Sequence, residues 1–214
     1  MAVITPTILA ETEDEYKATV ERLHPFAKRV HIDLTDGQFA PTFTIGVNKL
    51  WWPQEWIVDI HAMVNNPSQY IPTLIQLKPY SIIMHAEAGE DLTPSITAIK
   101  QAGIKVGIAL LRTTVPSTVQ EYIELADHVL VFSGDLGHYG GTASLMQLEK
   151  VRLVRSIHPE VEIGWDGGAN VENVFSLSQG SVDVINAGSA INKSEDPAAA
   201  YNLMVAEINK HSVI

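Results

Sequence analysis

Residues 30–37 read Val-His-Ile-Asp-Leu-Thr-Asp-Gly, a short apolar run that carries polar residues and ends in an Asp-Gly turn. Alternate residues of a strand point to opposite sides, so His31 and Asp33 face one side together, away from Ile32. A histidine and a carboxylate are seldom buried unless they are paired or bind a metal. Read alone, the stretch is equally compatible with a packed histidine beside an aspartate that caps the turn.

Seven other apolar runs resemble this one, and amphipathic segments with helical spacing separate them. Near-continuously apolar strands are typical of a parallel sheet that is covered on both faces. Eight strands in 214 residues predict a single (β/α)8 TIM barrel, one domain spanning residues 1–214. The alternative is a doubly wound open sheet, but the first strand–helix turn lacks the glycine fingerprint of that fold. The expected strands are Val3–Leu9, Val30–Leu34, Ile57–Met63, Tyr80–His85, Val106–Leu111, His128–Phe132, Val161–Trp165 and Val182–Ile185.

Charge and composition narrow the classes of partner. The chain has 14 Lys and Arg against 25 Asp and Glu, a net charge of −11, and no basic run, which argues against nucleic acid or an anionic membrane. It has no cysteine, so any metal must be held by His, Asp or Glu. We find neither a basic-then-apolar leader nor an apolar run long enough for a membrane span, and expect a cytoplasmic protein.

Polar residues stand where several predicted strands end. In a barrel of this type, those ends meet in one mouth. His31 and Asp33, His61 and Asp166 would converge there from three strands as two nitrogen and two oxygen ligands, which suit zinc, iron(II), manganese or cobalt. Each histidine taken alone is compatible with simple packing, but burying two carboxylates and two imidazoles without a cation is costly.

Two glycine turns follow the last two predicted strands, Asp166-Gly167-Gly168 and Ala187-Gly188-Ser189-Ala190. The loops after these strands form the usual phosphate site of the fold, and glycine lets backbone N–H groups approach the oxygens. A third glycine stretch, residues 134–141, is placed to cover the same site as a lid. The alternative is that all three are ordinary turns.

These motifs resemble the ribulose-phosphate 3-epimerase family, from Thr5 to about Tyr201. The most specific segments are HIDLTDGQFAPTFTIG at 31–46, DIHAMV at 59–64, DGG at 166–168 and AGSA at 187–190. The resemblance implies a TIM barrel of the ribulose-phosphate-binding type, with one divalent metal on the four residues named above. It further implies that Asp33 and Asp166 are the catalytic acid–base pair. The substrate contacts that it implies are Thr7, His61, Gly140, Gly141, Asp166, Gly167, Gly168, Gly188 and Ser189.

The activity implied is an isomerase reaction of the pentose phosphate pathway, in which D-ribulose 5-phosphate is epimerised at C3 to D-xylulose 5-phosphate. The two aspartates would transfer the proton through a metal-stabilised 2,3-enediolate, and no organic cofactor is required. One alternative is a hexulose-phosphate 3-epimerase acting on allulose 6-phosphate. Another is a non-catalytic phosphosugar-binding paralogue. A lyase reading is weakened because the stretch around Asp33 carries no lysine.

Several positions depart from the family pattern. Thr35 and Phe132 stand where methionines are expected, and Leu111-Arg112 replaces an Asn-Pro pair. The lid, residues 136–141, is one residue longer than usual. We hypothesise that Arg112 or His138 adds a contact to an anionic group of the substrate. An ion pair with Asp135 at the surface is the alternative.

We also expect a homo-oligomer. Trp51, Trp52 and Trp56 are unusual for a loop and would suit a subunit interface. The alternative is that these tryptophans cover the end of the barrel.

Overall fold

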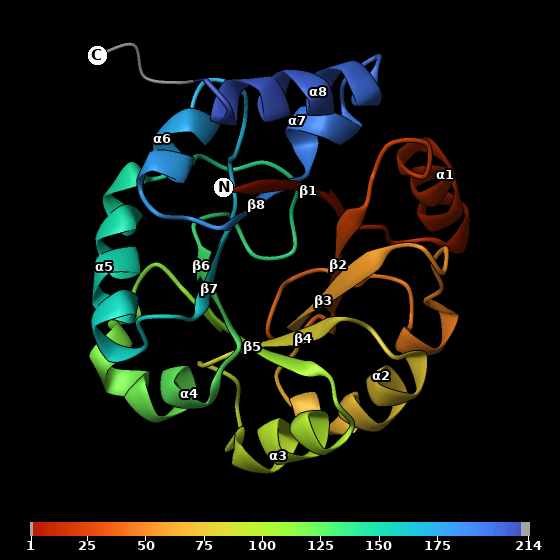
Figure 1. Cartoon of the computed structure of the whole chain (residues 1–214). Helices are drawn as coiled ribbons and strands as arrows, with labels where there is room; N and C mark the ends of the chain where they lie inside the picture. Colours follow the sequence, from red (N-terminus) through yellow and green to blue (C-terminus); the bar gives the residue numbers. More distant parts are fainter. Residues whose placement is uncertain (1, 211–214) are drawn as a thin grey trace.

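Eight parallel strands close into a barrel in the computed structural model, which describes residues 2–210. The strands pair in chain order, and β1 also pairs with β8, so the predicted TIM barrel is confirmed and the open sheet is wrong. Figure 1 shows the strands inside a ring of helices. The strands are β1 (Val3–Ile8), β2 (Arg29–Thr35), β3 (Ile57–Met63), β4 (Ser81–His85), β5 (Lys105–Leu110), β6 (His128–Phe132), β7 (Glu162–Asp166) and β8 (Val184–Ala187).

The helices begin at the local signals that the sequence carries. Thr12 and Glu15 form a capping box at the start of the first helix, and the Asp196 side chain accepts the N–H of Ala199 at the start of the last. The helices are α1 (Glu13–Leu23), α2 (Ile71–Leu77), α3 (Thr93–Gln101), α4 (Gln120–Leu125), α5 (Leu148–Ile157), α6 (Val174–Gln179), α7 (Ser189–Asn192) and α8 (Pro197–Ile208). Short 3-10 helices cover Val47–Lys49, Pro67–Gln69, Pro116–Val119 and Leu145–Gln147.

The apolar core has an outer and an inner part. The outer part lies between the strands and the helices and includes the fully buried Ile60, Leu74 and Trp165. Inside the barrel, Ile83, Ala109 and Leu130 form a small separate cluster. Because inward residues of a barrel stack in layers, this cluster separates the polar groups at the two ends of the strands.

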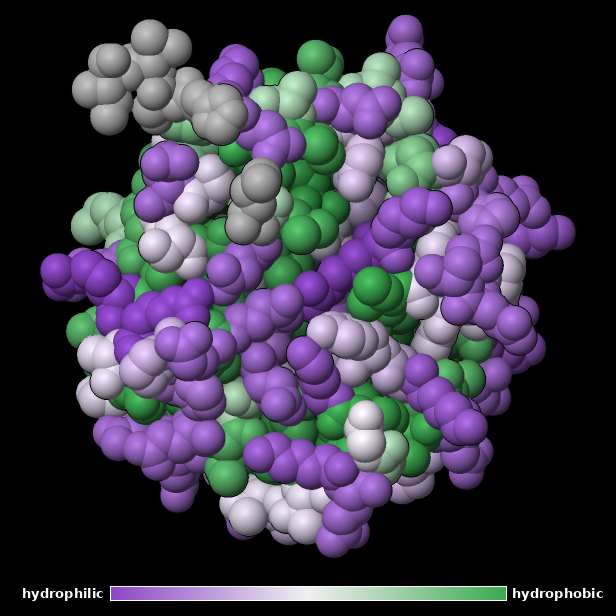
Figure 2. Space-filling model, in the orientation of Figure 1, coloured by the Kyte–Doolittle hydropathy of each residue, from purple (hydrophilic) through white to green (hydrophobic). Residues whose placement is uncertain are grey.

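The outer surface is mainly hydrophilic on the face seen in Figure 2, with smaller hydrophobic areas between. This is ordinary for the exterior of a folded domain, because apolar atoms always contribute part of the surface. Within residues 2–210, no helix combines the length and the apolar character needed to cross a bilayer.

The loop after β2 folds back on a sharp turn at Asp36-Gly37. Gly37 has φ +70°, and a Cβ there would lie 2.1 Å from the ring of Phe43, so only glycine fits. The Asp36 side chain accepts the N–H groups of Gln38 and Phe39, both at 2.9 Å. The turn thereby fixes the end of β2, where Asp33 and Thr35 point into the barrel.

Candidate active site

Three strands bring four ligand-type side chains together at the carboxyl-terminal end of the barrel. His31 and Asp33 come from β2, His61 from β3 and Asp166 from β7, and one ligand atom of each lies within 4.8 Å of the others. His61 Nδ1 is 3.0 Å from Asp33 Oδ1 and 3.5 Å from Asp166 Oδ2. His31 Nε2 is 3.3 Å from Asp33 Oδ1 and 3.7 Å from Asp166 Oδ2.

The electrostatics of this cluster favour a positive charge at its centre. Burial opposes protonation of His61, but Asp166 and Asp33 outweigh it and raise its pKa to about 9. Burial also opposes ionisation of Asp33, but His31 and His61 hold the pKa of that carboxyl down to about 2. The two carboxylates of this buried site therefore favour a positive charge on the imidazole between them. A divalent cation would supply the same charge and displace that proton.

The donor set fits a divalent metal. Among the described residues, neither ring nitrogen of His31 has a hydrogen-bond partner, although the side chain is buried. An imidazole left without partners in a buried site is costly unless something else binds it. Two imidazoles and two carboxylates offer nitrogen and oxygen ligands of the kind that zinc, iron(II), manganese and cobalt accept.

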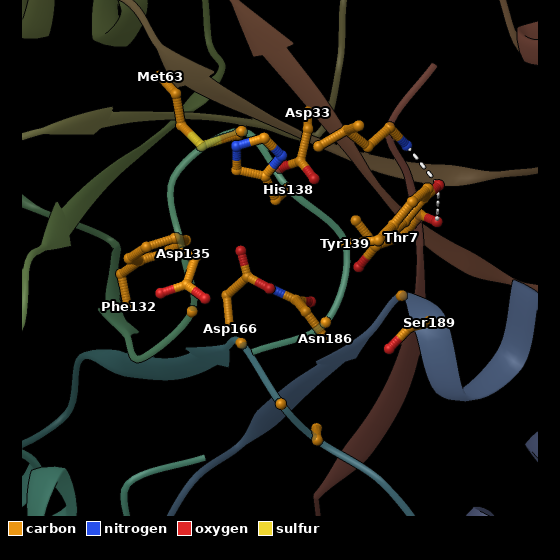
Figure 3. Close-up of a pocket in the computed structure, with 18 residues that line it drawn as sticks. Thr7, Asp33, Met63, Phe132, Asp135, His138, Tyr139, Asp166, Asn186 and Ser189 are labelled. Atoms are coloured by element: carbon orange, nitrogen blue, oxygen red, sulfur yellow. Dashed lines mark hydrogen bonds between the residues drawn. The ribbon is translucent and has the colours of Figure 1, made fainter. Parts of the chain in front are cut away.

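A pocket opens directly above this cluster. Asp33 and Asp166 line it, and Figure 3 shows their carboxylates pointing toward one another from different strands. The empty space among the lining residues, counted together with the part that is open to solvent, is about 430 Å³. Met63 and Phe132 form one side, while Gly188 and other members of the glycine turns after β7 and β8 form another.

The turns after β7 and β8 have the backbone freedom that a phosphate site requires. Gly167 and Gly168 have φ +106° and +71°, and a Cβ on Gly168 would lie 2.1 Å from the backbone nitrogen of Ala143. Side chains at these two positions would collide with the neighbouring loop. Gly188 and Ser189 line the same end of the pocket at the end of β8. The open backbone at this end can present N–H groups to phosphate oxygens.

The stretch from Gly134 to Gly141 lies over the pocket and is tied to its surroundings. The Tyr139 hydroxyl accepts the N–H of Leu9 at 2.7 Å, and a Cβ on Gly188 would lie 2.7 Å from the Tyr139 ring. Thr42 donates to the carbonyl of Gly137 at 2.9 Å. These contacts join the lid to β1, to the loop after β2 and to the turn after β8, so the pocket is covered in this structure.

The predicted site residues divide into those that line the pocket and those that do not. His31 and His61 lie below the pocket, fully buried. Gly141 packs behind it against Gly134 and Asp135, and Arg112 lies outside its lining. The predicted residues on the lining are Thr7, Asp33, His138, Gly140, Asp166, Gly167, Gly168, Gly188 and Ser189.

Arg112 takes the alternative role considered for it. Its guanidinium is 3.0 Å from the carboxylate of Asp135, both side chains being about half exposed or more, and it also donates to the carbonyl of Gly134 at 3.1 Å. His138 lies on the pocket side of the lid. Thr35, which stands at a methionine position of the family, is buried but outside the pocket lining, whereas Phe132 is part of it.

Two polar residues of the lining, Asn186 and Tyr139, were not assigned a role from the sequence. Asn186 ends up beside Asp166 in the register of β7 and β8, and neither polar atom of its buried side chain has a partner among the described residues. The position of Asn186 at the end of a predicted strand was the one feature of the sequence that could have indicated a place in the site. Tyr139 reaches Leu9 across 130 positions of the chain, and no local pattern predicts that contact.

The family model for the ribulose-phosphate 3-epimerase family matches residues 3–192. The chain belongs to this family. Ribulose-phosphate 3-epimerase of Mycobacterium leprae is 32% identical over 207 residues, covering 92% of this chain and 91% of the relative. The enzyme of the same name from Helicobacter pylori is 33% identical over 175 residues, covering 78% and 80%. The chain is therefore an isomerase of the epimerase type, acting on carbohydrates.

More distant barrels share only the fold with this epimerase. KGPDC from Streptococcus mutans superposes with a TM-score of 0.75 at 11% identity, covering 97% of each chain. The 3-hexulose-6-phosphate synthase from Salmonella typhimurium gives a TM-score of 0.73 at 16% identity, covering 96% of this chain and 97% of the other. At such identities the likeness carries the architecture and not the reaction.

Proposed function

We propose that this epimerase interconverts D-ribulose 5-phosphate and D-xylulose 5-phosphate at C3, with a divalent metal on His31, Asp33, His61 and Asp166. One observation carries the proposal. Two carboxylates from β2 and β7 meet two imidazoles from β2 and β3 at the floor of a pocket, and turns rich in glycine line the same pocket. This arrangement matches a small ketose with a phosphate at one end.

The two aspartates are suited to opposite proton transfers. Epimerisation requires one group to remove the C3 proton, which the neighbouring carbonyl makes acidic, and another to return a proton from the other face. Asp33 and Asp166 flank the pocket from different strands (Figure 3). In each direction one aspartate acts as the ionised base and the other as the protonated acid, and their roles exchange when the reaction runs backwards.

The four ligand-type residues would hold the cation. When bound, a divalent cation would supply a Lewis acid that stabilises the negative charge developing on the substrate. His31 and His61 come from adjacent strands whose register is fixed over seven residue pairs, so the backbone positions of both residues are set before substrate arrives. Thr7, whose buried hydroxyl has no partner in the described part of the chain, is placed to bond a sugar hydroxyl.

The phosphate would lie against the backbone of the glycine turns. Gly167, Gly168, Gly188 and Ser189 line that end of the pocket, together with Gly140 from the lid. Backbone N–H groups can bind an anion without a lysine or an arginine, which agrees with the acidic composition of the chain. Tyr139 holds the lid over this end through its hydrogen bond with Leu9.

The test combines metal analysis with an epimerase assay. The purified protein should contain close to one zinc, iron, manganese or cobalt per chain, lose activity when the metal is removed and regain it on re-addition. In heavy water, deuterium should enter C3 of ribulose 5-phosphate. Absence of exchange at C3 would indicate a non-catalytic sugar phosphate binder. Faster turnover of allulose 6-phosphate in the same assay would assign the enzyme to hexulose phosphates.

A further inference from the structure

Another buried histidine, His85, lies directly behind His61, outside the pocket. His85, at the end of β4, is fully buried, and its Nε2 is 2.9 Å from His61 Nε2. The rings of Phe39 and Phe132 lie 4.7 and 5.7 Å from the His85 ring, between centroids. His85 touches neither the pocket nor the carboxylates of the proposed metal site, so the proposed reaction leaves it without a role.

Glu87, two residues further on, holds the other side of this ring. Its Oε2 is 3.3 Å from His85 Nδ1. Its Oε1 accepts the backbone N–H of Leu111 at 2.9 Å and the hydroxyl of Thr114. The carboxylate is therefore fixed from two sides and presents only acceptor atoms to His85. The proton of the neutral His85 ring must then lie on Nδ1, facing Glu87.

This arrangement decides where His61 carries its own proton. Two ring nitrogens 2.9 Å apart share one hydrogen, because two N–H groups would repel at that distance. With Nδ1 of His85 protonated, its Nε2 has a free lone pair and must be the acceptor. His61 then donates from Nε2, which leaves Nδ1, on the side of Asp33 and Asp166, as the nitrogen that a cation binds when it displaces the proton there.

We infer that His85 and Glu87 are positioning residues that hold His61 in the one tautomer whose Nδ1 can bind the metal. The chain from Glu87 through His85 to His61 does what a carboxylate bonded directly to a metal-binding histidine does in other proteins. It also fixes the plane of the ring, because both nitrogens of His61 have directed partners. This inference rests on the metal site of the proposed function.

The first variant reverses the polarity of the chain at its far end. In Glu87→Gln, an amide N–H must face either His85 Nδ1 or the N–H of Leu111, and either contact sets donor against donor. The affinity of the metal-stripped protein for Zn²⁺, titrated against a chromophoric chelator, should fall about 10- to 100-fold. The matched control is Glu90→Gln, three residues away, whose carboxylate bonds Ser68 at the surface. It should bind Zn²⁺ as the wild type does.

Two substitutions of His85 give an independent test, so that the result does not depend on the correct folding of one variant. In His85→Gln, the amide oxygen can accept from His61 and the amide nitrogen can donate to Glu87, which restores the polarity of the chain. In His85→Leu nothing accepts the His61 proton. The Zn²⁺ affinity of His85→Gln should therefore lie within about 10-fold of the wild-type affinity. The Zn²⁺ affinity of His85→Leu should lie well below that of both proteins. A purely structural role for the ring would give no such difference between the amide and the isobutyl side chain.

Ring ¹⁵N chemical shifts of the zinc-loaded protein show directly which nitrogen of each histidine carries the proton. The wild type should show His61 protonated on Nε2 and His85 protonated on Nδ1. The inference is overturned if Glu87→Gln and His85→Leu bind Zn²⁺ within twofold of the wild type, or if His85 carries its proton on Nε2. If the wild type itself binds no Zn²⁺ and has no epimerase activity, the proposed function fails first. A wild type that is active with metal, beside unaffected variants, refutes the positioning role alone.

Discussion

At the amino-terminal end of the barrel, the Arg29 guanidinium lies between Asp59 and Glu162. At the carboxyl-terminal end, the ion-pair partners of Asp33 and Asp166 within residues 2–210 are imidazoles. Arg29 donates to both oxygens of Asp59, at 2.6 and 3.2 Å, and to both oxygens of Glu162, at 2.8 Å each. Ser81 also donates to Asp59 at 2.6 Å. Each carboxylate oxygen of Asp59 and Glu162 therefore accepts from at least one donor.

The mouth of the barrel is the opposite case. The Oδ2 atom of Asp166 is 3.5 and 3.7 Å from the two nearest imidazole nitrogens, which is longer than a hydrogen bond. In the part of the chain that the structure describes, the buried polar atoms of His31, Thr7 and Asn186 have no partners. A buried charged group whose partners are supplied by the fold serves stability. One whose partners are missing is arranged for something that binds from outside.

The largest expected effect is on activity at the mouth. In Asp33→Asn or Asp166→Asn, the amide can neither take nor deliver the C3 proton, and a metal ligand is weakened. We expect kcat to fall by about 10²- to 10⁴-fold or more in each variant. Asp14→Asn, on the exposed side of α1, is the matched control and should leave kcat unchanged. Near-native turnover in either variant would refute the acid–base assignment.

The next effect is on stability at the opposite end. In Arg29→Leu, the buried Asp59 and the partly buried Glu162 lose their shared cation, and removal of one partner from a buried pair costs about 3–5 kcal/mol of unfolding free energy. Urea unfolding would measure the loss. Because the Ile83, Ala109 and Leu130 cluster lies between the two ends, kcat of the folded fraction should stay at the wild-type value. A variant that keeps its stability but loses activity would contradict this division.

The convergence of the side chains at the strand ends could be predicted from the sequence, because it follows from the parallel topology of the barrel. Once eight apolar runs are placed in a barrel, their carboxyl-terminal residues must share one mouth, and the period of two selects which side chains point inward. The structure accordingly brings His31, Asp33, His61 and Asp166 together. The same rule puts Asp59 inside the barrel, but not at the mouth. Its partner Arg29 was not anticipated, because arginine at a strand start usually faces solvent.

Loop contacts could not be predicted in the same way. The Tyr139 hydroxyl meets Leu9, and Gly141 packs behind the pocket and not on its lining, because both depend on how a long loop folds over the mouth. The His61–His85 contact lies between these cases. Both histidines were placed at strand ends, but the 2.9 Å approach depends on ring orientation, which Glu87 and the phenylalanine rings decide.

The carboxylate of Glu162, at the amino-terminal end of the barrel, should also make the stability of the protein depend on pH. Burial opposes ionisation of Glu162, but hydrogen bonds from Arg29 and His128 outweigh it and hold the pKa of this carboxyl well below its ordinary value of 4.5. A carboxyl with a lowered pKa adds stability above about pH 4.5, and that stability is lost as the pH falls. Glu162→Gln should make the loss of unfolding free energy below that pH shallower, by at most about 1.4 kcal/mol per pH unit. Urea unfolding from pH 5 to 3 measures the slope, and equal slopes would contradict the assignment.

The smallest expected effects lie in the lid. Its contact through Tyr139 is partly buried, and its contact with Arg112 is exposed. Tyr139→Phe leaves the partly buried N–H of Leu9 without its acceptor, a cost of about 1–3 kcal/mol to the closed lid. KM for ribulose 5-phosphate should therefore rise several-fold. Arg112→Ala breaks an ion pair between half-exposed side chains, and such pairs contribute little. Its KM should stay within about twofold of the wild type. A larger rise in Arg112→Ala than in Tyr139→Phe would show that Arg112 contacts the substrate, as hypothesised from the sequence.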